Sequence, residues 1–506
     1  MKIFLSAKPT LQKNKAVVVC FFNDKERTAA SPHSFFKTLP AKDASYLADV
    51  MKHDFTTSQE KFREVHFPSN PDHLVVFANL GKKDSWDEKK WALFVRKAVV
   101  YMKDRRIPSF SVFLGDFAAR ALSPEYLLKT LGENALMADS TFSKFKEAPK
   151  EGWPVIKDFE IISPDAKSAK LAEALKSGIT IGEEVNACRE LSNMPGSDMT
   201  PRVLANAARR IGKRAKIKVT VLEENAMKKL GMGGVLGVSK GSDEKPQFII
   251  LEYKSPKANK KTKPLVFAGK GVTFDTGGLN IKPGEHMYEM HMDMAGGAAV
   301  MHALAAIARM KLPVHIIGLV PAVENMPSGS SYHPGDILKT ITGKTIEVLN
   351  TDAEGRVILA DALGYAQRFN PKLILSVATL TGAAVVAVGQ KVIALFSTSE
   401  KLEFLMREVG KVSGDAVWPL PMGDEYLDEV KGTFGDVANV GKSKYGGATA
   451  GAIFLKQFVG NFPFVHLDIA PTMTTIEGQY LAKGASGSGV RFLVELAKNV
   501  NKIPEN

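Results

Sequence analysis

The chain has 506 residues, more than one hydrophobic core usually serves, so we expect two domains. Its hydrophobic content of 45% and charged content of 24% are ordinary for a globular protein, and no apolar run approaches the ~20 residues of a bilayer span. Two cysteines, Cys20 and Cys188, exclude a disulfide framework and a zinc knuckle. Because a signal-peptide core is also lacking, we expect a cytoplasmic protein without membrane attachment.

The formal net charge of +13 is unevenly distributed. Residues 1–150 hold 25 Lys and Arg against 17 Asp and Glu, which gives +8 and leaves +5 for the rest. A basic N-terminal third can attract nucleic acid. However, acids alternate with the lysines of residues 82–90, and no nucleic-acid recognition motif accompanies the charge. We therefore favour a solvated face and keep nucleic-acid binding as the alternative.

The first third of the chain alternates β-rich and helical patterns. Strands are expected at 16–22, 73–78 and 109–114, and helices at 43–53 and 86–104. This alternation predicts a small N-terminal α/β domain over residues 1–160. A connecting helix, predicted at 166–191 within the linker 161–195, places Cys188 in a buried position and ends at Asn193-Met194-Pro195-Gly196.

Residues 196–506 form the predicted catalytic domain. Near-continuous apolar runs, typical of strands buried on both faces, occur at 248–253, 264–268, 314–320, 373–378 and 464–469. Helical patterns lie between them, at 296–310, 354–369, 400–410 and 448–458. The expected fold is therefore α/β, with a mostly parallel central sheet flanked by helices.

Polar residues follow two of these predicted strands directly. Lys270 and Asp275 come after the strand that ends at Ala268, and Thr379-Leu380-Thr381-Gly382 follows the strand that ends at Ala378. Ligands of parallel α/β sheets bind beyond the carboxyl ends of the strands. We therefore expect the functional site at this edge.

Four acids of this domain offer hard oxygen ligands: Asp275, Asp293, Asp352 and Glu354. Taken singly, such acids are usually turn or helix-capping residues. Here they share Gly-rich turns with three cations, which a solvated turn does not need: Lys270, Lys282 and Arg356. The combination favours a hydrolytic metal site.

Other catalytic patterns are absent or poorly placed. The sequence has no His-Glu-x-x-His, and Gly237-Val238-Ser239-Lys240-Gly241 lacks the strand and helix that a nucleophile elbow needs. We expect this stretch to be a loop.

The stretch Asn350-Thr351-Asp352-Ala353-Glu354-Gly355-Arg356 resembles the signature of the leucyl (cytosol) aminopeptidase family. Several further stretches between about 165 and 500 are similar to that family: 269–278, Lys282-Pro283, Asp293-Met294, 379–383, 466–470, Asn193, Pro195 and Thr200-Pro201. The resemblance implies a metal-dependent peptidase that removes N-terminal residues.

The resemblance also implies a centre with two divalent ions. Asp275 and Glu354 would bridge both ions, Lys270 and Asp293 would complete the tight site, and Asp352 the more exchangeable one. Zn²⁺ is expected at the tight site, and Mn²⁺, Mg²⁺ or Co²⁺ at the other. Such ions activate water and polarise the substrate.

The remaining implied roles concern proton transfer and the substrate. Lys282 would stabilise the oxyanion, and Arg356 would bind bicarbonate as the general base. Leu- or Met-like N-terminal residues are expected in a pocket formed by Met290, Asn350, Thr379, Leu380, Gly382, Ala470 and Met473. Pro471 and His291 depart from the residues common in the family.

The resemblance further implies a homohexamer that acts on peptides. Two alternatives remain at this point. One is a dipeptidase specific for Cys-Gly-type substrates. The other is a DNA-binding architectural protein that uses the basic N-terminal third.

Overall fold

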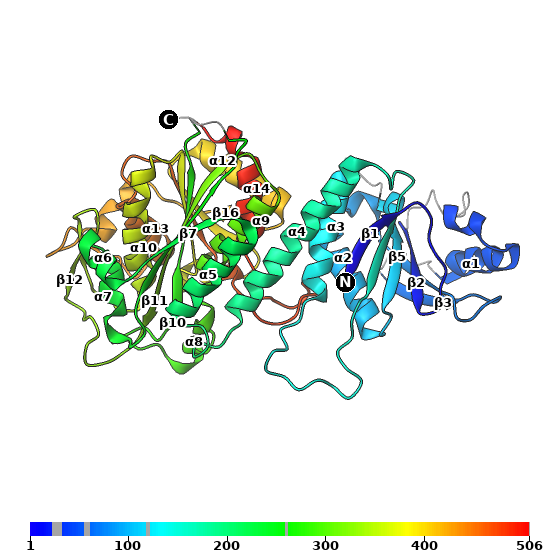
Figure 1. Ribbon diagram of the computed structural model, residues 1–506, viewed down its shortest axis with the longest axis horizontal. Coiled ribbons are helices and arrows are strands. Elements are labelled where there is room, and N and C mark those ends of the chain that lie inside the picture. The colour runs from blue at the N-terminus through cyan, green and yellow to red at the C-terminus, as the bar shows by residue number, and fades with distance from the viewer. Residues whose placement is uncertain (23–32, 55–60, 118–121, 259–261, 505–506) are drawn as a thin grey trace. The chain divides into compact units, whose positions relative to one another are not determined.

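The computed structural model describes residues 1–22, 33–54, 61–117, 122–258 and 262–504 (Figure 1). The chain divides into two compact units. Unit 1 comprises residues 1–183 and 477–482, and unit 2 comprises 184–476 and 483–506. The chain therefore passes from one unit to the other three times, first inside helix α4 (Ala169–Ser192). In the described ranges, we find no helix with both the length and the apolar character that a membrane span requires.

Unit 1 contains one mixed sheet. Its strands are β1 (Lys2–Ser6), β2 (Lys15–Phe21), β3 (Lys61–His66), β4 (Leu74–Asn79), β5 (Ser109–Phe113) and β6 (Asp158–Ile162). Its helices are α1 (Ala41–Asp54), α2 (Glu88–Asp104), α3 (Pro124–Asp139) and the first part of α4. The strand order is β1-β6-β5-β2-β4-β3, parallel except where β3 pairs with β4.

The strands predicted in this unit are β2, β4 and β5, and the structure adds β1, β3 and β6. Strand β6 is hard to recognise because its five residues include two acids, Asp158 and Glu160. Glu160 is nevertheless buried, since its carboxylate lies 2.6 Å from Lys15 Nζ and accepts a 2.7 Å hydrogen bond from Ser111 Oγ. A buried ion pair thus allows an acidic strand inside the sheet.

Unit 2 contains two sheets. Its strands are β7 (Lys218–Leu222), β8 (Gln247–Lys254), β9 (Leu265–Gly269), β10 (Gly271–Asp275), β11 (His315–Asn325), β12 (Ile337–Lys339), β13 (Thr345–Glu347), β14 (Leu373–Ala378), β15 (Ile393–Ser397), β16 (Val417–Pro419), β17 (Val437–Ala438) and β18 (Phe464–Asp468). Its helices, besides the end of α4, are α5 (Pro201–Ala215), α6 (Glu224–Leu230), α7 (Gly233–Val238), α8 (Gly284–Met287), α9 (Ala295–Arg309), α10 (Glu354–Ala366), α11 (Gly382–Val388), α12 (Glu400–Ser413), α13 (Gly447–Lys456) and α14 (Val490–Lys498).

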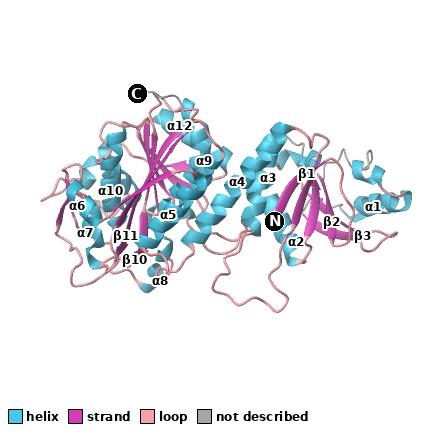
Figure 2. Cartoon of the chain, viewed as in Figure 1, coloured by secondary structure: helices cyan, strands magenta, loops and turns pink. Residues whose placement is uncertain are grey.

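The main sheet of unit 2 has nine strands in the described residues (Figure 2). The order is β16-β15-β18-β14-β9-β11-β8-β7, and β10 adds to β11. Its centre is parallel: β14 pairs with β18 and β9, and β11 pairs with β9 and β10. Antiparallel β7 and β8 form one edge, and the pair β15–β16 runs antiparallel to β18 at the other. The expected mostly parallel α/β fold is therefore confirmed.

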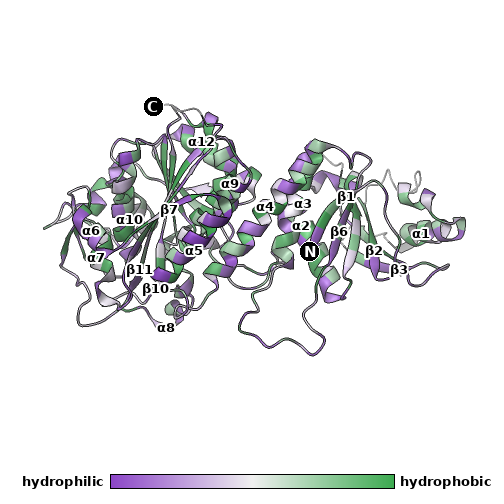
Figure 3. Cartoon of the chain, in the orientation of Figure 1, coloured by the Kyte–Doolittle hydropathy of each residue, from purple (hydrophilic) through white to green (hydrophobic). Residues whose placement is uncertain are grey.

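Helices cover both faces of this sheet. Helices α7, α10 and α13 share one hydrophobic core with sheet residues such as Val266 and Ile317. Helix α9 packs on the opposite face, since a methyl group added to Gly318 would lie 3.0 Å from Val300 Cγ1. Figure 3 shows helices with both green and purple segments, as expected for layers that bury one side and expose the other.

A charge cluster around a buried glutamate joins the end of α4 to α5 and α9 within unit 2. Glu184, which is 0% exposed, accepts hydrogen bonds from Arg214 Nη2 (2.6 and 2.7 Å) and Arg309 Nη1 (2.6 Å). The ring nitrogen Nδ1 of His302 lies 2.9 Å from the same carboxylate. Burial alone would raise the pKa of Glu184, but His302 and the two arginines outweigh it and lower the pKa.

The stretch around Ser239 differs from its prediction. It is not a loop, because helix α7 is followed directly by a 3-10 turn at Ser239–Gly241. The Ser239 hydroxyl donates to Leu236 O (3.1 Å) and the side chain is buried. A helix precedes the serine where a nucleophile elbow has a strand, so the arrangement is structural.

Candidate metal centre

Four parallel strands deliver polar residues to one edge of the main sheet of unit 2. Lys270 directly follows β9, Asp275 ends β10, Thr379 directly follows β14, and Asp468 ends β18. Strands β18, β14 and β9 are parallel neighbours, and β10 runs in the same direction because it is parallel to β11, so the carboxyl ends of all four meet at the same edge. The hydrophobic runs that were read as strands thus place the predicted polar residues together.

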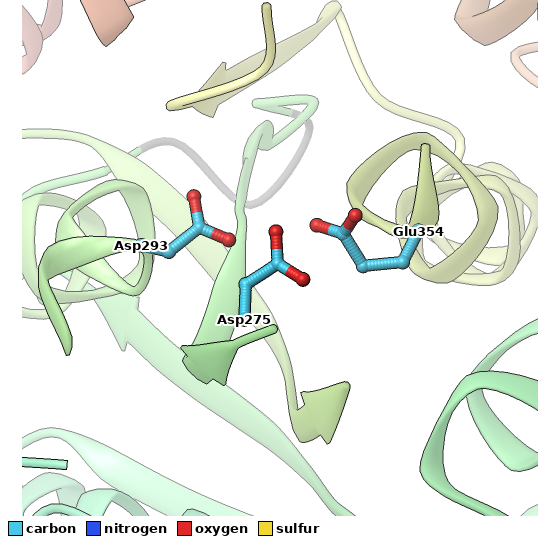
Figure 4. A group of neighbouring side chains, drawn as sticks. All are labelled: Asp275, Asp293 and Glu354. Carbon is cyan, nitrogen blue, oxygen red and sulfur yellow. The ribbon is translucent and has the colours of Figure 1, made fainter. Parts of the chain in front are cut away.

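Three carboxylates converge at this edge (Figure 4). Asp275, Asp293 and Glu354 each direct one oxygen into a common space, and these oxygens lie within 4.8 Å of one another. Asp293 follows the 3-10 turn Met290–Met292, and Glu354 is the first residue of α10. The three acids are 1–2% exposed. Burial of this many negative charges is unfavourable without cations.

Lys270 supplies one of those cations. Its Nζ lies 2.7 Å from Asp293 Oδ2 and 2.8 Å from Glu354 Oε1, and it donates a 3.1 Å hydrogen bond to Thr379 O. Burial by itself lowers the pKa of Lys270, but the carboxylates of Asp293, Glu354 and Asp275 outweigh it and raise the pKa. The ammonium group therefore acts as a counter-ion among the acids.

Lys282 is the second cation. Its Nζ lies 2.9 Å from Asp275 Oδ2 and also pairs with Asp352 Oδ1, while its side chain is only 14% exposed. Burial by itself lowers the pKa of Lys282, but the surrounding acids outweigh it and raise the pKa. Asp352 is half-buried, and burial followed by repulsion from Asp275 raises its pKa. Five predicted ligands and Lys282 are thus assembled in one charged cluster.

The carboxylates retain capacity for ligands. Asp293 Oδ2, Asp352 Oδ1 and Glu354 Oε1 are buried, and in the described part of the chain they accept no hydrogen bond of suitable geometry, although lysine nitrogens lie nearby. Oxygens of this kind are preferred ligands of Mg²⁺, Mn²⁺ and Zn²⁺. The residues present therefore fit a divalent metal ion.

Asn325 holds this edge together and was missed by the sequence analysis. It ends β11, and its Nδ2 donates to Asp275 Oδ1 (2.9 Å) and to Thr351 O (3.0 Å). The side chain is 0% exposed. It therefore joins the end of β10 to the stretch that carries Asp352. The strand-end argument applied to Lys270 would have found Asn325 had the predicted strand been extended from 320 to 325.

The loop after β14 is fixed by two buried acids. Thr379 Oγ1 donates to Asp293 Oδ1 (2.7 Å), whereas Leu380 N (3.0 Å) and Thr381 Oγ1 (2.7 Å) donate to the carboxylate of Asp468. Asp468 is 0% exposed. These hydrogen bonds therefore fix the loop both to the acidic cluster and to the end of β18.

The predicted pocket residues lie on loops around the same edge. Helix α11, which begins at Gly382, contacts the 3-10 turn Ala470–Thr472, and Met473 ends that turn. Pro471 is buried in the turn, whereas Met290 and His291 are half-buried in the turn before Asp293. The hydrogen bond from Thr379 to Asp293 joins the loop that leads into Gly382 to the turn that carries Met290.

Arg356 lies beside the cluster and is only 7% exposed. Its Nη1 donates to Asn439 O (2.9 Å), and its buried Nε has no hydrogen-bond partner among the described residues. Burial lowers the pKa of Arg356 to about 10, so the guanidinium stays charged at neutral pH. His466 is buried nearby, and burial followed by repulsion from Arg356 lowers its pKa to about 3. A charged donor next to a neutral imidazole suits an anion.

Comparison with known proteins agrees with this site. Residues 186–494 match the model of the cytosol aminopeptidase family, catalytic domain. The chain is 39% identical to a probable cytosol aminopeptidase of Roseiflexus castenholzii over 85% of this chain and 88% of that protein. It is 44% identical to a probable cytosol aminopeptidase of an Azoarcus species over 83% of each chain.

A solved structure resembles the whole chain. The bottromycin maturation enzyme BotP in complex with Mn superposes with a TM-score of 0.82 at 26% identity, covering 97% of this chain and 100% of that chain. Likeness in sequence and fold thus extends over both units. With a buried acidic cluster that fits a metal and a family match over most of unit 2, the chain belongs to the cytosol aminopeptidase family.

Proposed function

We propose that this protein is a two-metal aminopeptidase that releases apolar, Leu- or Met-like residues from peptides with a free α-amine. The observation that carries the proposal is the convergence of Asp275, Asp293 and Glu354 beside Lys270, with Asp352 joined to the same cluster through Lys282.

The proposed ligand sets are those that the family resemblance implies, and the grouping of the acids around Lys270 supports them. Asp275 and Glu354 would be shared by two divalent ions, Lys270 and Asp293 would complete the tight site, and Asp352 would serve the exchangeable one. Zn²⁺ is proposed for the tight site, and Mn²⁺, Mg²⁺ or Co²⁺ for the other. When bound, such ions supply an activated water and electrophilic assistance at the carbonyl. With such ions bound, Lys270 would be a neutral amine, because divalent cations oppose its protonation.

Lys282 is proposed to stabilise the negative charge that develops on the substrate carbonyl oxygen. An ammonium group has three N–H donors. Asp275 and Asp352 are its ion-pair partners among the described residues, which leaves one donor for the substrate. The two carboxylates hold the side chain in place, so the charge is positioned before the reaction begins.

Arg356 is proposed to bind bicarbonate, which would accept the proton that the attacking water loses. The fit is supported by the buried Nε that lacks a partner among the described residues and by the charge that Arg356 keeps at neutral pH. His466 is unsuited to this task, because its low pKa leaves it a very weak base.

The apolar residue released would contact Met290, Thr379, Leu380, Gly382, Ala470 and Met473, with Asn350 at the edge of the pocket. Methionine side chains adapt to several apolar shapes, which supports a preference for Leu and Met. We further propose that the protein is cytoplasmic and assembles as a homohexamer. Analytical ultracentrifugation would test the number of subunits.

The first test is hydrolysis of leucine p-nitroanilide by the purified protein, with and without Mn²⁺ or Zn²⁺, beside its N-acetylated counterpart. Metal-dependent release from the free amine alone is the expected result. Equal hydrolysis of both compounds would contradict recognition of the α-amine. Release from Cys-Gly only would replace the proposal with a narrow dipeptidase.

The second test measures bound metal directly. Glu354→Ala should lose a bridging ligand, and with it both turnover and bound ions measured by elemental analysis. Glu224→Ala is a suitable control, since it removes an acid of the same unit that pairs with Lys228 within helix α6. Full ion content in Glu354→Ala would overturn the two-metal assignment.

A further inference from the structure

Asn439 makes an unusual number of contacts for a residue outside the acidic cluster. It directly follows β17 and is 0% exposed. Its Oδ1 accepts hydrogen bonds from Leu349 N (2.8 Å) and Asn350 N (3.3 Å), and its Nδ2 donates to Asn350 O (2.6 Å). Its backbone N donates to Glu347 O (3.0 Å), and its carbonyl accepts from Arg356 Nη1 (2.9 Å).

The chemistry of these partners requires an amide. Two backbone N–H groups face one side-chain atom of Asn439, and a carbonyl faces the other. Only a carboxamide offers an acceptor and a donor on one short planar group. An aspartate at this position would place a carboxylate oxygen against Asn350 O, where a donor is needed.

The contacts link two parts of the site. The Asn439 side chain holds the backbone N and O of Asn350. The side-chain Oδ1 of Asn350 in turn accepts a 2.8 Å hydrogen bond from Asp352 N. Asn439 therefore fixes the turn that carries Asp352, while its carbonyl orients the guanidinium of Arg356. Among the described residues, Asn439 is the one that forms hydrogen bonds with both Asn350 and Arg356.

We propose that Asn439 is a positioning residue that fixes the Asp352 carboxylate relative to the Arg356 guanidinium. It thereby couples the exchangeable metal position to the anion site. This inference rests on the proposed function, in which Asp352 serves the second ion and Arg356 binds bicarbonate. The proposed tight-site residues form no hydrogen bond or ion pair with Asn439 in the described part of the chain; they are Lys270, Asp275, Asp293 and Glu354.

The test compares Asn439→Asp with the wild type in the full-length protein. Bound ions are counted by elemental analysis after dialysis, and kcat is followed against bicarbonate concentration with leucine p-nitroanilide. We expect one ion to be kept and the other to bind roughly 10–100-fold more weakly, as is typical when a partner of a metal ligand is removed. We also expect half-activation to require more bicarbonate, whereas KM stays within a few-fold.

Asn134→Asp is the matched control. Asn134 is also 0% exposed, its Oδ1 accepts from Arg96 Nε (2.7 Å) and its Nδ2 donates to Thr130 O (2.8 Å), but it lies in unit 1. The control introduces the same chemical change and should keep both ions and the bicarbonate response.

Three outcomes decide the matter. Wild-type ion content and bicarbonate response in Asn439→Asp overturn the inference. If that variant does not fold, Asn439→Ala, which adds no charge, is judged by the same measurements. If the wild type itself binds one ion or ignores bicarbonate, the proposed function fails first, and the coupling assigned to Asn439 fails with it.

Discussion

Gly355→Ala is the substitution that tests the site most directly without removing any proposed ligand. A methyl group at position 355 would lie 2.5 Å from Lys270 Cε and 2.8 Å from both Cδ and Nζ. Carbon atoms in favourable contact are about 3.5–4.0 Å apart, so the lysine side chain must move by roughly 1 Å. Lys270 is 3% exposed and held by Asp293 and Glu354, which leaves little room for that movement.

Two effects on stability oppose each other in this variant. Alanine is favoured over glycine inside a helix by about 1 kcal/mol, and Gly355 is the second residue of α10. Overpacking of a buried site costs about 1–3 kcal/mol. The free energy of unfolding should therefore fall by no more than about 2 kcal/mol.

Activity should suffer more than stability. A displacement of about 1 Å in a reactive group can lower the rate by about 10²-fold, which corresponds to about 2.7 kcal/mol in the activation barrier. The assays are kcat with leucine p-nitroanilide, bound metal by elemental analysis, and urea unfolding. Gly329→Ala is the control, since a methyl group there meets no atom within 4 Å. A Gly355→Ala protein with wild-type kcat and ion content would refute the role given to Lys270.

Three further predictions concern other parts of the chain. Lys282→Ala should lower kcat by about 10²–10³ while bound metal is kept, and an effect on KM alone would contradict the oxyanion role. Glu184→Gln should lower the free energy of unfolding at pH 7 by about 1–3 kcal/mol, because it removes the carboxylate that contacts buried His302 and the partly exposed Arg214 and Arg309. Burial would raise the pKa of Glu184, but His302 and the arginines outweigh it and lower the pKa. The carboxylate therefore stabilises the fold above its unfolded pKa of about 4.3, and this stabilisation is lost as the pH falls through the lower pKa of the folded state. A stability difference between wild type and Glu184→Gln that is the same at pH 7 and pH 2.5 in urea titrations would contradict this. Gly178→Ala should lower the free energy of unfolding of unit 1 by about 1–3 kcal/mol, because the added methyl group would lie 2.0 Å from Lys129 O. Unchanged stability in thermal unfolding would show that α3 and α4 can move apart without cost.

The sequence predicted the buried parallel strands and the residues at their ends well. Strands β9 and β14 are fully buried runs, so their composition alone distinguishes them, and parallel pairing then places Lys270 and Thr379 together. Strand β3, at the edge of the sheet, was not predicted, because its residues, Lys-Phe-Arg-Glu-Val-His, include four polar ones and do not alternate between polar and apolar.

The asparagines were not predictable in the same way. Asn325 reaches Asp275 across 50 residues, and Asn439 reaches Asn350 across 89, so no local pattern marks either contact. A single asparagine in a loop has the same sequence context whether it caps a turn or holds a site. Only the tertiary pairing of β13 with β17 brings Asn439 to its partners.

Residues 477–482 give unit 1 an unusual order of completion. This short segment belongs to unit 1, where Gln479 O accepts a 3.4 Å hydrogen bond from Arg96 Nη1, yet all of unit 2 up to residue 476 precedes it in the chain. During synthesis about 290 residues separate it from residue 183, which takes roughly 15–60 s at about 5–20 residues per second. Unit 1 is therefore completed only after residues 477–482 have been synthesised, and the hydrogen bond from Arg96 to Gln479 cannot form before then.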